Sequence, residues 1–132
     1  NVNEVIDAFG FDFVSQPQVK YTLHKQKKKE GIFETDQFTI RLSEFYSDGL
    51  LYSPEDFKNF ETLSLVLIDL DYEADPFTMD MHLWGKDLVK DETTPVEISI
   101  DAEKWKKGKL AIILIDEYGN ENKLVLDKND FQ

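Results

Sequence analysis

The sequence predicts an all-β fold, a sandwich of two antiparallel sheets with about seven strands. Several segments alternate apolar and polar residues with the period of two that a half-buried strand produces. Residues 63–70 and 110–115 are apolar on both faces apart from Ser64, which is typical of central strands. Helical patterns are few and short. A chain of 132 residues has the usual size of one domain, so we expect a single domain over residues 1–132.

The first part of the chain predicts a helix followed by two strands. In the helical lead-in, residues 1–16, Val2, Val5, Ile6 and Phe9 share one face and Gly10 supplies the stop. Strands are predicted at residues 19–24 and 38–43, where apolar residues alternate with polar ones. The lysine-rich segment 25–30 reads as a solvated loop between them, with an additional short strand near Ile32.

The remaining elements follow from caps and turns. Ser53, Pro54 and Asp56 form an acidic variant of the capping box and predict a short helix over residues 54–60. Residues 77–84 and 96–100 read as one-sided strands, the first with Phe77, Met79, Met81 and Leu83 facing inward. Gly119 predicts a tight hairpin before a final strand at 123–127. We expect the core to centre on Leu65, Leu67, Ile112 and Leu114.

Charge and composition exclude several classes of protein. The net charge of −12 disfavours nucleic-acid binding, because phosphate contacts need positive potential. The two lysine clusters, Lys25, Lys27, Lys28 and Lys29 and then Lys104, Lys106, Lys107 and Lys109, are too short to change this expectation. No cysteine is present, which excludes disulfides and thiol chemistry. No apolar run is long enough to span a bilayer, and we expect no cofactor and no membrane partner.

The stretch LIDLDYEADPFTMD places carboxylates at alternating positions. Asp69, Asp71, Glu73, Asp75 and Asp80 fall on positions 1, 3, 5, 7 and 12 of a calcium-loop template. Ala74 stands where that loop needs glycine, and the preceding residues read as a strand rather than a helix. We therefore favour an acidic strand end that meets water, with a metal site at Asp69, Asp71, Glu73 and Asp75 as the alternative.

Catalytic groups are scarce in the sequence. His24 and His82 both fall on outward positions of predicted strands, with no neighbouring signal for a nucleophile. Alternation places Asp80, His82 and Trp84 on one outward face, and a Trp beside polar groups can serve as a platform for a sugar or a protein. The competing interpretation, which we favour, is that a loop or the opening helix covers Trp84.

Residues PVEISIDAEKWKKGKLAIILIDEYGNENKLVLD resemble the last three strands of a bacterial immunoglobulin-like domain, with a short helical crossing at Asp101 and a hairpin at Asp116, Gly119 and Asn120. The resemblance implies an immunoglobulin-like sandwich. The segments FETLSLVLIDLDYEADPF and IDEYGNEN also resemble the non-catalytic C-terminal region of bacterial restriction-modification DNA methyltransferases. The catalytic and cofactor motifs of those enzymes are absent here, so no methyl-transfer role is implied for any residue.

Two classes of function remain open. The first is a non-catalytic interaction or scaffolding domain, acidic in character and cut from a longer bacterial protein, because the chain begins with Asn1. Its partner would be another protein or a neighbouring domain of the parent chain. We expect the parent protein to be cytoplasmic, and the second resemblance suggests that it is a DNA methyltransferase. The alternative is an extracellular immunoglobulin-like module that binds calcium or a glycan. We expect no enzyme activity from this chain alone.

Overall fold

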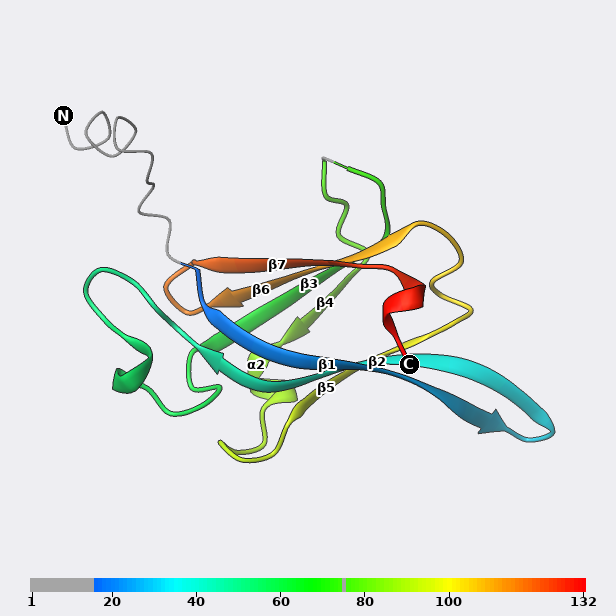
Figure 1. The fold of residues 1–132 in the computed structure, drawn as a ribbon, viewed down its shortest axis with the longest axis horizontal. Helices are drawn as coiled ribbons and strands as arrows, with labels where there is room; N and C mark the ends of the chain where they lie inside the picture. Colours follow the sequence, from blue (N-terminus) through cyan, green and yellow to red (C-terminus); the bar gives the residue numbers. More distant parts are fainter. Residues whose placement is uncertain (1–15, 75) are drawn as a thin grey trace.

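The computed structural model describes residues 16–74 and 76–132, which form seven strands in two antiparallel sheets (Figure 1). The strands are β1 (Gln18–Glu30), β2 (Phe33–Tyr46), β3 (Leu63–Tyr72), β4 (Met81–Trp84), β5 (Val96–Asp101), β6 (Lys109–Asp116) and β7 (Glu121–Leu126). One sheet has the order β1-β2-β5 and the other β4-β3-β6-β7. The predicted all-β sandwich is confirmed, whereas residues 1–15 of the predicted helical lead-in lie outside the described residues.

The core fills the space between the two sheets. Every second residue of β2, β5, β3 and β6 points inward, as the period of a strand requires. The buried inward residues of these strands include Ile40, Leu42, Val66, Ile68, Ile98, Ile100, Ile112 and Leu114. β3 and β6 pair with each other inside the four-stranded sheet, so the two predicted central strands are correct.

An aromatic cluster closes one end of the core. Trp105, in the connection between β5 and β6, is fully buried and packs edge-to-face against Phe38 and Phe131, with ring centroids 5.0 Å and 5.6 Å away. Its indole Nε1 donates to the carbonyl oxygen of Gly108 at 3.1 Å. Trp105 therefore anchors a lysine-rich connection that contains turns rather than the helical crossing expected at Asp101.

The predicted phase of β3 is wrong by one residue. Val66 and Ile68 are fully buried, whereas Leu65 and Leu67 lie on the opposite side of the sheet and are only half-buried. The alternation of residues along a strand cannot show which face points inward when both faces are apolar, because either set of side chains could pack in the core.

Two predicted elements have different bounds. The strand expected at 77–84 is β4 alone: Met81 and Leu83 pack against the core, but Met79 lies in the preceding loop and is 54% exposed. The helix expected at 54–60 is the 3₁₀ turn η1 (Pro54–Asp56), where the Asp56 carboxylate accepts a hydrogen bond from the Ser53 amide at 2.8 Å, as the predicted capping box requires. Two further short helical elements are α2 (Gly85–Leu88) and η2 (Lys128–Asp130).

The lysine-rich segment is a strand rather than a loop. β1 continues to Glu30, and its residues pair with β2 as far as Phe33. β5 ends at Asp101 opposite Gln37, so the hairpin beyond that level has two strands. We call residues 25–36 the hairpin arm; it projects from the end of the sandwich (Figure 1). Ion pairs cross the arm between Lys27 and Asp36 at 2.7 Å and between Lys29 and Glu34 at 3.9 Å.

Candidate functional site

The sandwich has two outer faces, and the face of the three-stranded sheet is polar. Arg41 of β2 donates to Glu97 of β5 at 3.1 Å, and Thr39 bonds Ser99 at 3.0 Å on the same face. His24 of β1 lies beside them and its ring bonds the Thr22 hydroxyl at 2.8 Å. Polar residues on the solvent side of a sheet are the usual arrangement, so this face suggests no binding site.

The outer face of the four-stranded sheet is largely apolar. The strand register aligns three rows across it: Trp84, Leu65, Ile115 and Glu121; His82, Leu67, Ile113 and Lys123; and Asp69, Ala111 and Val125. Trp84 and Val125 are 48% and 44% exposed, and Leu65, Leu67 and Ile115 are half-buried. We call the residues Leu65, Leu67, Trp84, Ile113, Ile115 and Val125 the apolar outer face. Its apolar side chains belong to every strand of the sheet, and none of them lies between the two sheets.

The predicted Asp80, His82 and Trp84 grouping lies at one edge of this face. The His82 and Trp84 rings meet edge-to-face with centroids 5.8 Å apart. Asp80 precedes β4, and its carboxylate accepts a hydrogen bond from the Leu70 amide at 2.7 Å, so it fixes the loop instead of extending the platform. Trp84 is half exposed, so the expectation that a loop covers it is wrong. The opening helix, the other predicted cover, lies outside the described residues.

Gly85 explains how Trp84 reaches its position. β4 ends at Trp84, and the chain turns at once into α2 with the Gly85 Cα packed against the backbone of Leu63. A Cβ atom at position 85 would collide with the Leu63 carbonyl oxygen, so only glycine allows this approach. The short β4 and the close turn together hold the Trp84 ring at the border of the apolar outer face.

The acidic stretch after β3 is arranged as a loop anchor. Asp69 is only 2% exposed, and its two carboxylate oxygens accept hydrogen bonds from the amides of Asp71 at 3.0 Å and Thr78 at 2.8 Å. Asp71 and Glu73 are exposed, and Asp75 lies outside the described residues. Among the residues that the structure describes, no group of three or more acidic or histidine side chains is placed to hold a metal ion. The expectation that the whole stretch meets water therefore fails at Asp69, which holds the following loop.

A second buried aspartate anchors the opposite end of the central strands. Asp116 is 2% exposed and accepts hydrogen bonds from the Ser47 hydroxyl at 2.8 Å and from the amides of Tyr118 and Asn120 at 3.0 Å and 2.8 Å. Ser47 also contacts the Thr62 hydroxyl at 2.6 Å. These contacts connect a carboxylate with hydroxyls and amides in a closed network. Ser47 is fully buried, so its hydroxyl is out of reach of a substrate.

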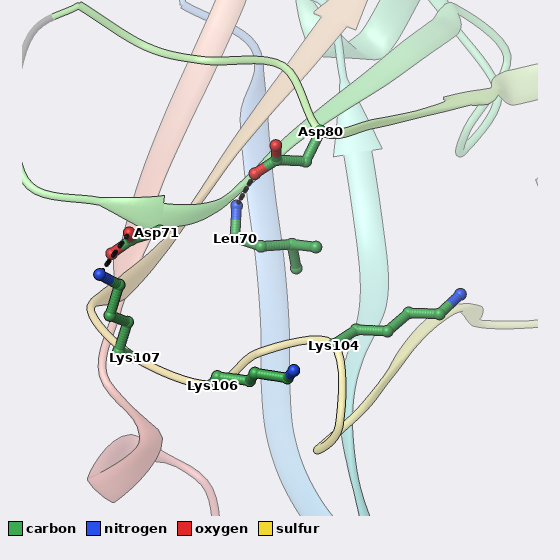
Figure 2. Close-up of a pocket in the computed structure, with 6 residues that line it drawn as sticks. All are labelled: Leu70, Asp71, Asp80, Lys104, Lys106 and Lys107. Atoms are coloured by element: carbon green, nitrogen blue, oxygen red, sulfur yellow. Dashed lines mark hydrogen bonds and ion pairs between the residues drawn. The ribbon is translucent and has the colours of Figure 1, made fainter.

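A shallow pocket of about 270 Å³ lies between the end of β3 and the lysine-rich connection (Figure 2). It is lined by Leu70, Asp71, Asp80, Lys104, Lys106 and Lys107. Lys107 Nζ lies 3.9 Å from the Asp71 carboxylate, as the dashed line in Figure 2 shows. The Asp71 carboxylate is paired with Lys107 and the Asp80 carboxylate is engaged by the Leu70 amide, so the pocket does not present two free carboxylates to a metal cation.

The apolar outer face was not identified from the sequence. The signal is present, because residues 63–70 and 110–115 are apolar on both faces, but the same pattern also predicts strands that are buried on both faces. Comparisons of the chain with known protein families, with curated proteins and with solved structures find no match. No helix among the described residues is long and apolar enough to cross a membrane.

Proposed function

We propose that this chain is a non-catalytic interaction domain that binds a protein partner through the apolar outer face of its four-stranded sheet. The observation that supports the proposal is the contrast between the two outer faces of the same sandwich. One carries the polar side chains normal for a solvated sheet, and the other carries leucine, isoleucine, valine and tryptophan.

The exposure of individual side chains indicates where the binding energy would come from. Leu65 and Leu67 are already half-buried by their neighbours, so a partner would remove further water mainly from Trp84 and Val125. Burying a large apolar side chain contributes about 1.5–3 kcal/mol, and tryptophan is enriched among the residues that dominate interfaces. Glu121 and Lys123 provide a charged rim beside the apolar centre, as in typical interfaces.

The strand order supports an immunoglobulin-like reading of the sandwich within this proposal. In the constant-type arrangement the first, second, fifth and fourth strands form one sheet and the third, sixth and seventh form the other. This chain has the same two groups except that β4 pairs with β3 and not with β5, which makes the sheet of β3, β6 and β7 the four-stranded one. The role as an accessory domain of a cytoplasmic bacterial methyltransferase stays a prediction, because this sequence contains none of the catalytic or cofactor motifs of those enzymes.

The proposal is tested with substitutions on the two outer faces. Leu67→Asp places a charge in the centre of the apolar outer face, and Thr22→Asp places one on the polar face as a matched control. The wild-type domain and both variants are immobilised, and proteins captured from the source cells are compared by quantitative mass spectrometry. We expect a partner that binds wild type and Thr22→Asp but not Leu67→Asp.

The captured partner is then purified and titrated into the domain labelled with 5-fluorotryptophan. The chain has two Trp residues, of which Trp84 is half exposed and Trp105 is fully buried. Binding at the apolar outer face should shift the fluorine resonance of Trp84 and leave that of Trp105 in place. A partner that shifts neither resonance, or no partner that distinguishes Leu67→Asp from Thr22→Asp, would contradict the proposal.

A further inference from the structure

The two ends of the sandwich carry exposed apolar side chains that the proposed function does not use. At one end, Ile32 and Phe33 form the tip of the hairpin arm and are 92% and 69% exposed. β1 and β2 run antiparallel, so the arm and the loop that follows β2 lie at opposite ends of the molecule (Figure 1). An apolar tip on a charged two-stranded arm has no role in stabilising the fold, because it contacts none of the core.

The opposite end combines a pocket with exposed apolar residues. The pocket has a volume of about 330 Å³ and is lined by Gln18, Glu44, Tyr46, Pro54, Glu55 and Phe57. Tyr52 and Tyr118 stack beside it with ring centroids 4.6 Å apart, and Phe57 meets the Tyr52 ring edge-to-face at 5.7 Å. Leu50 and Leu51, in the same loop, are 71% and 95% exposed. We call residues 44–61 with this pocket the acidic end.

The hairpin arm and the acidic end carry net charges of opposite sign. The arm has four lysines and three acidic residues, a net charge of +1. Residues 44–61 contain five acidic residues and one lysine, a net charge of −4.

We propose that the hairpin arm of one copy of this domain docks into the acidic end of a second copy. Phe33 enters the pocket against Tyr46, Pro54 and Phe57, while the arm lysines approach Glu44 and Glu55 at its rim. The contact joins two different surfaces, so it repeats head to tail and forms an open chain of copies rather than a closed dimer.

Charge complementarity selects this occupant for the pocket. Two arms packed on each other would bring their lysines together, and two acidic ends would bring carboxylates together, whereas the head-to-tail contact pairs opposite charges. Repulsion between two copies that each carry a net charge of −12 does not prevent this contact at physiological salt. The ends are separated by the length of β1, about 40 Å for its 13 residues, which exceeds the screening length of about 8 Å.

The absence of cysteine allows a direct test by site-specific cross-linking. Two single variants are prepared, Ile32→Cys at the arm tip and Glu55→Cys at the pocket rim, and both positions are exposed. They are mixed in equal amounts at physiological salt and treated with a short bis-maleimide. We expect the mixture to give cross-linked dimers that contain one chain of each variant, in clear excess over the dimers that either variant forms alone. Met79→Cys in place of Ile32→Cys controls for random collision, because Met79 is also an exposed apolar residue but lies in the loop before β4.

Sedimentation velocity over a concentration series supplies a second measurement on the unmodified chain. Phe33→Ser should weaken association by about tenfold or more, as expected for a residue at the centre of a contact, whereas Met79→Ser should leave it unchanged. The inference is overturned if arm–arm dimers dominate the cross-linking, if Met79→Cys reacts as well as Ile32→Cys, or if the wild-type protein sediments as a monomer throughout. These outcomes are independent of the apolar outer face, which neither Ile32 nor Glu55 belongs to, so failure here leaves the proposed function standing.

Discussion

Removal of the Asp116 carboxylate should destabilise the fold more than its position at a strand end suggests. This side chain is almost fully buried and accepts three hydrogen bonds, from the Ser47 hydroxyl and from the Tyr118 and Asn120 amides. A hydrogen bond to a charged group contributes about 1.5–3 kcal/mol, but the two amides belong to a turn where water can replace part of the loss. We therefore expect Asp116→Ala to lower the free energy of unfolding by about 2–4 kcal/mol.

The expected change in melting temperature follows from the size of the chain. A domain of 132 residues has an unfolding entropy of about 0.28 kcal/mol/K, so each kcal/mol corresponds to about 3.6 °C. Asp116→Ala should lower the midpoint by about 7–14 °C, measured by circular dichroism at neutral pH. In Asp116→Asn the side-chain oxygen can still accept from the two amides. Its NH₂ group can donate to the Ser47 hydroxyl oxygen, because the Ser47 proton can turn toward the Thr62 hydroxyl. Its loss should stay below about 1.5 kcal/mol, or about 5 °C.

Asp127 provides the matched control for this experiment. It is an exposed aspartate that accepts one hydrogen bond from the Asn129 amide at 3.2 Å at the start of η2. Asp127→Ala should cost about 1 kcal/mol, the usual effect of losing a helix cap. If Asp116→Ala and Asp127→Ala melted together, the buried network would not stabilise the fold as argued. Equal losses from Asp116→Ala and Asp116→Asn would show that the charge, and not the number of acceptor oxygens, is what matters.

Three further predictions concern β3, the turn after β4 and a surface loop. Ile68→Ala should lower the free energy of unfolding by about 2–5 kcal/mol because Ile68 is fully buried, whereas Leu67→Ala on the outer face should lower it clearly less. Equal losses in chemical denaturation would contradict the assignment of Ile68 to the inner face of β3 and Leu67 to its outer face. Gly85→Ala should destabilise the protein and increase acrylamide quenching of Trp84, because the new Cβ collides with the β3 backbone; unchanged stability and quenching would count against the close approach. Hydrogen bonds from the amides and side chains of Thr93 and Thr94 lower the pKa of Asp91 from 3.8 to about 2. The stability that this carboxylate contributes is therefore complete above pH 3.8 and is lost as the pH falls toward 2. A carbon-13 titration midpoint of Asp91 near 4 would refute this.

The sequence predicts the fold well because most strands have one polar face. The residues around Ile40 and Ile98 alternate with charged or hydroxyl side chains, which fixes both the strand and its inward face. The Gly119 hairpin was also predictable, since a positive φ there, observed at 85°, is what a tight turn requires. The capping box at Ser53 was found, but three residues of helix follow where seven were expected, because tertiary contacts and not the cap decide helix length.

The candidate surfaces were harder to predict because they depend on what the fold leaves uncovered. Leu65 and Leu67 are as apolar as Val66 and Ile68, so no local pattern states which pair faces the other sheet. The lysines of the hairpin arm resemble a solvated loop in composition, yet cross-strand pairing with Glu34 and Asp36 makes them part of a strand. The role of Asp69 as a buried loop anchor depends on the Thr78 amide nine residues later, a contact that no calcium-loop template contains.

The lysines of β1 also affect how the protein resists aggregation. β1 is an edge strand, and a long edge with unpaired amides and carbonyls can recruit the same strand of another molecule into an extended sheet. Pairing two β1 edges antiparallel near their far halves would bring Lys25, Lys27 and Lys29 of both molecules onto one narrow ribbon. Their mutual repulsion opposes lateral sheet growth at this edge of the sandwich. Replacing these lysines with threonine should therefore favour fibril formation without altering the native fold.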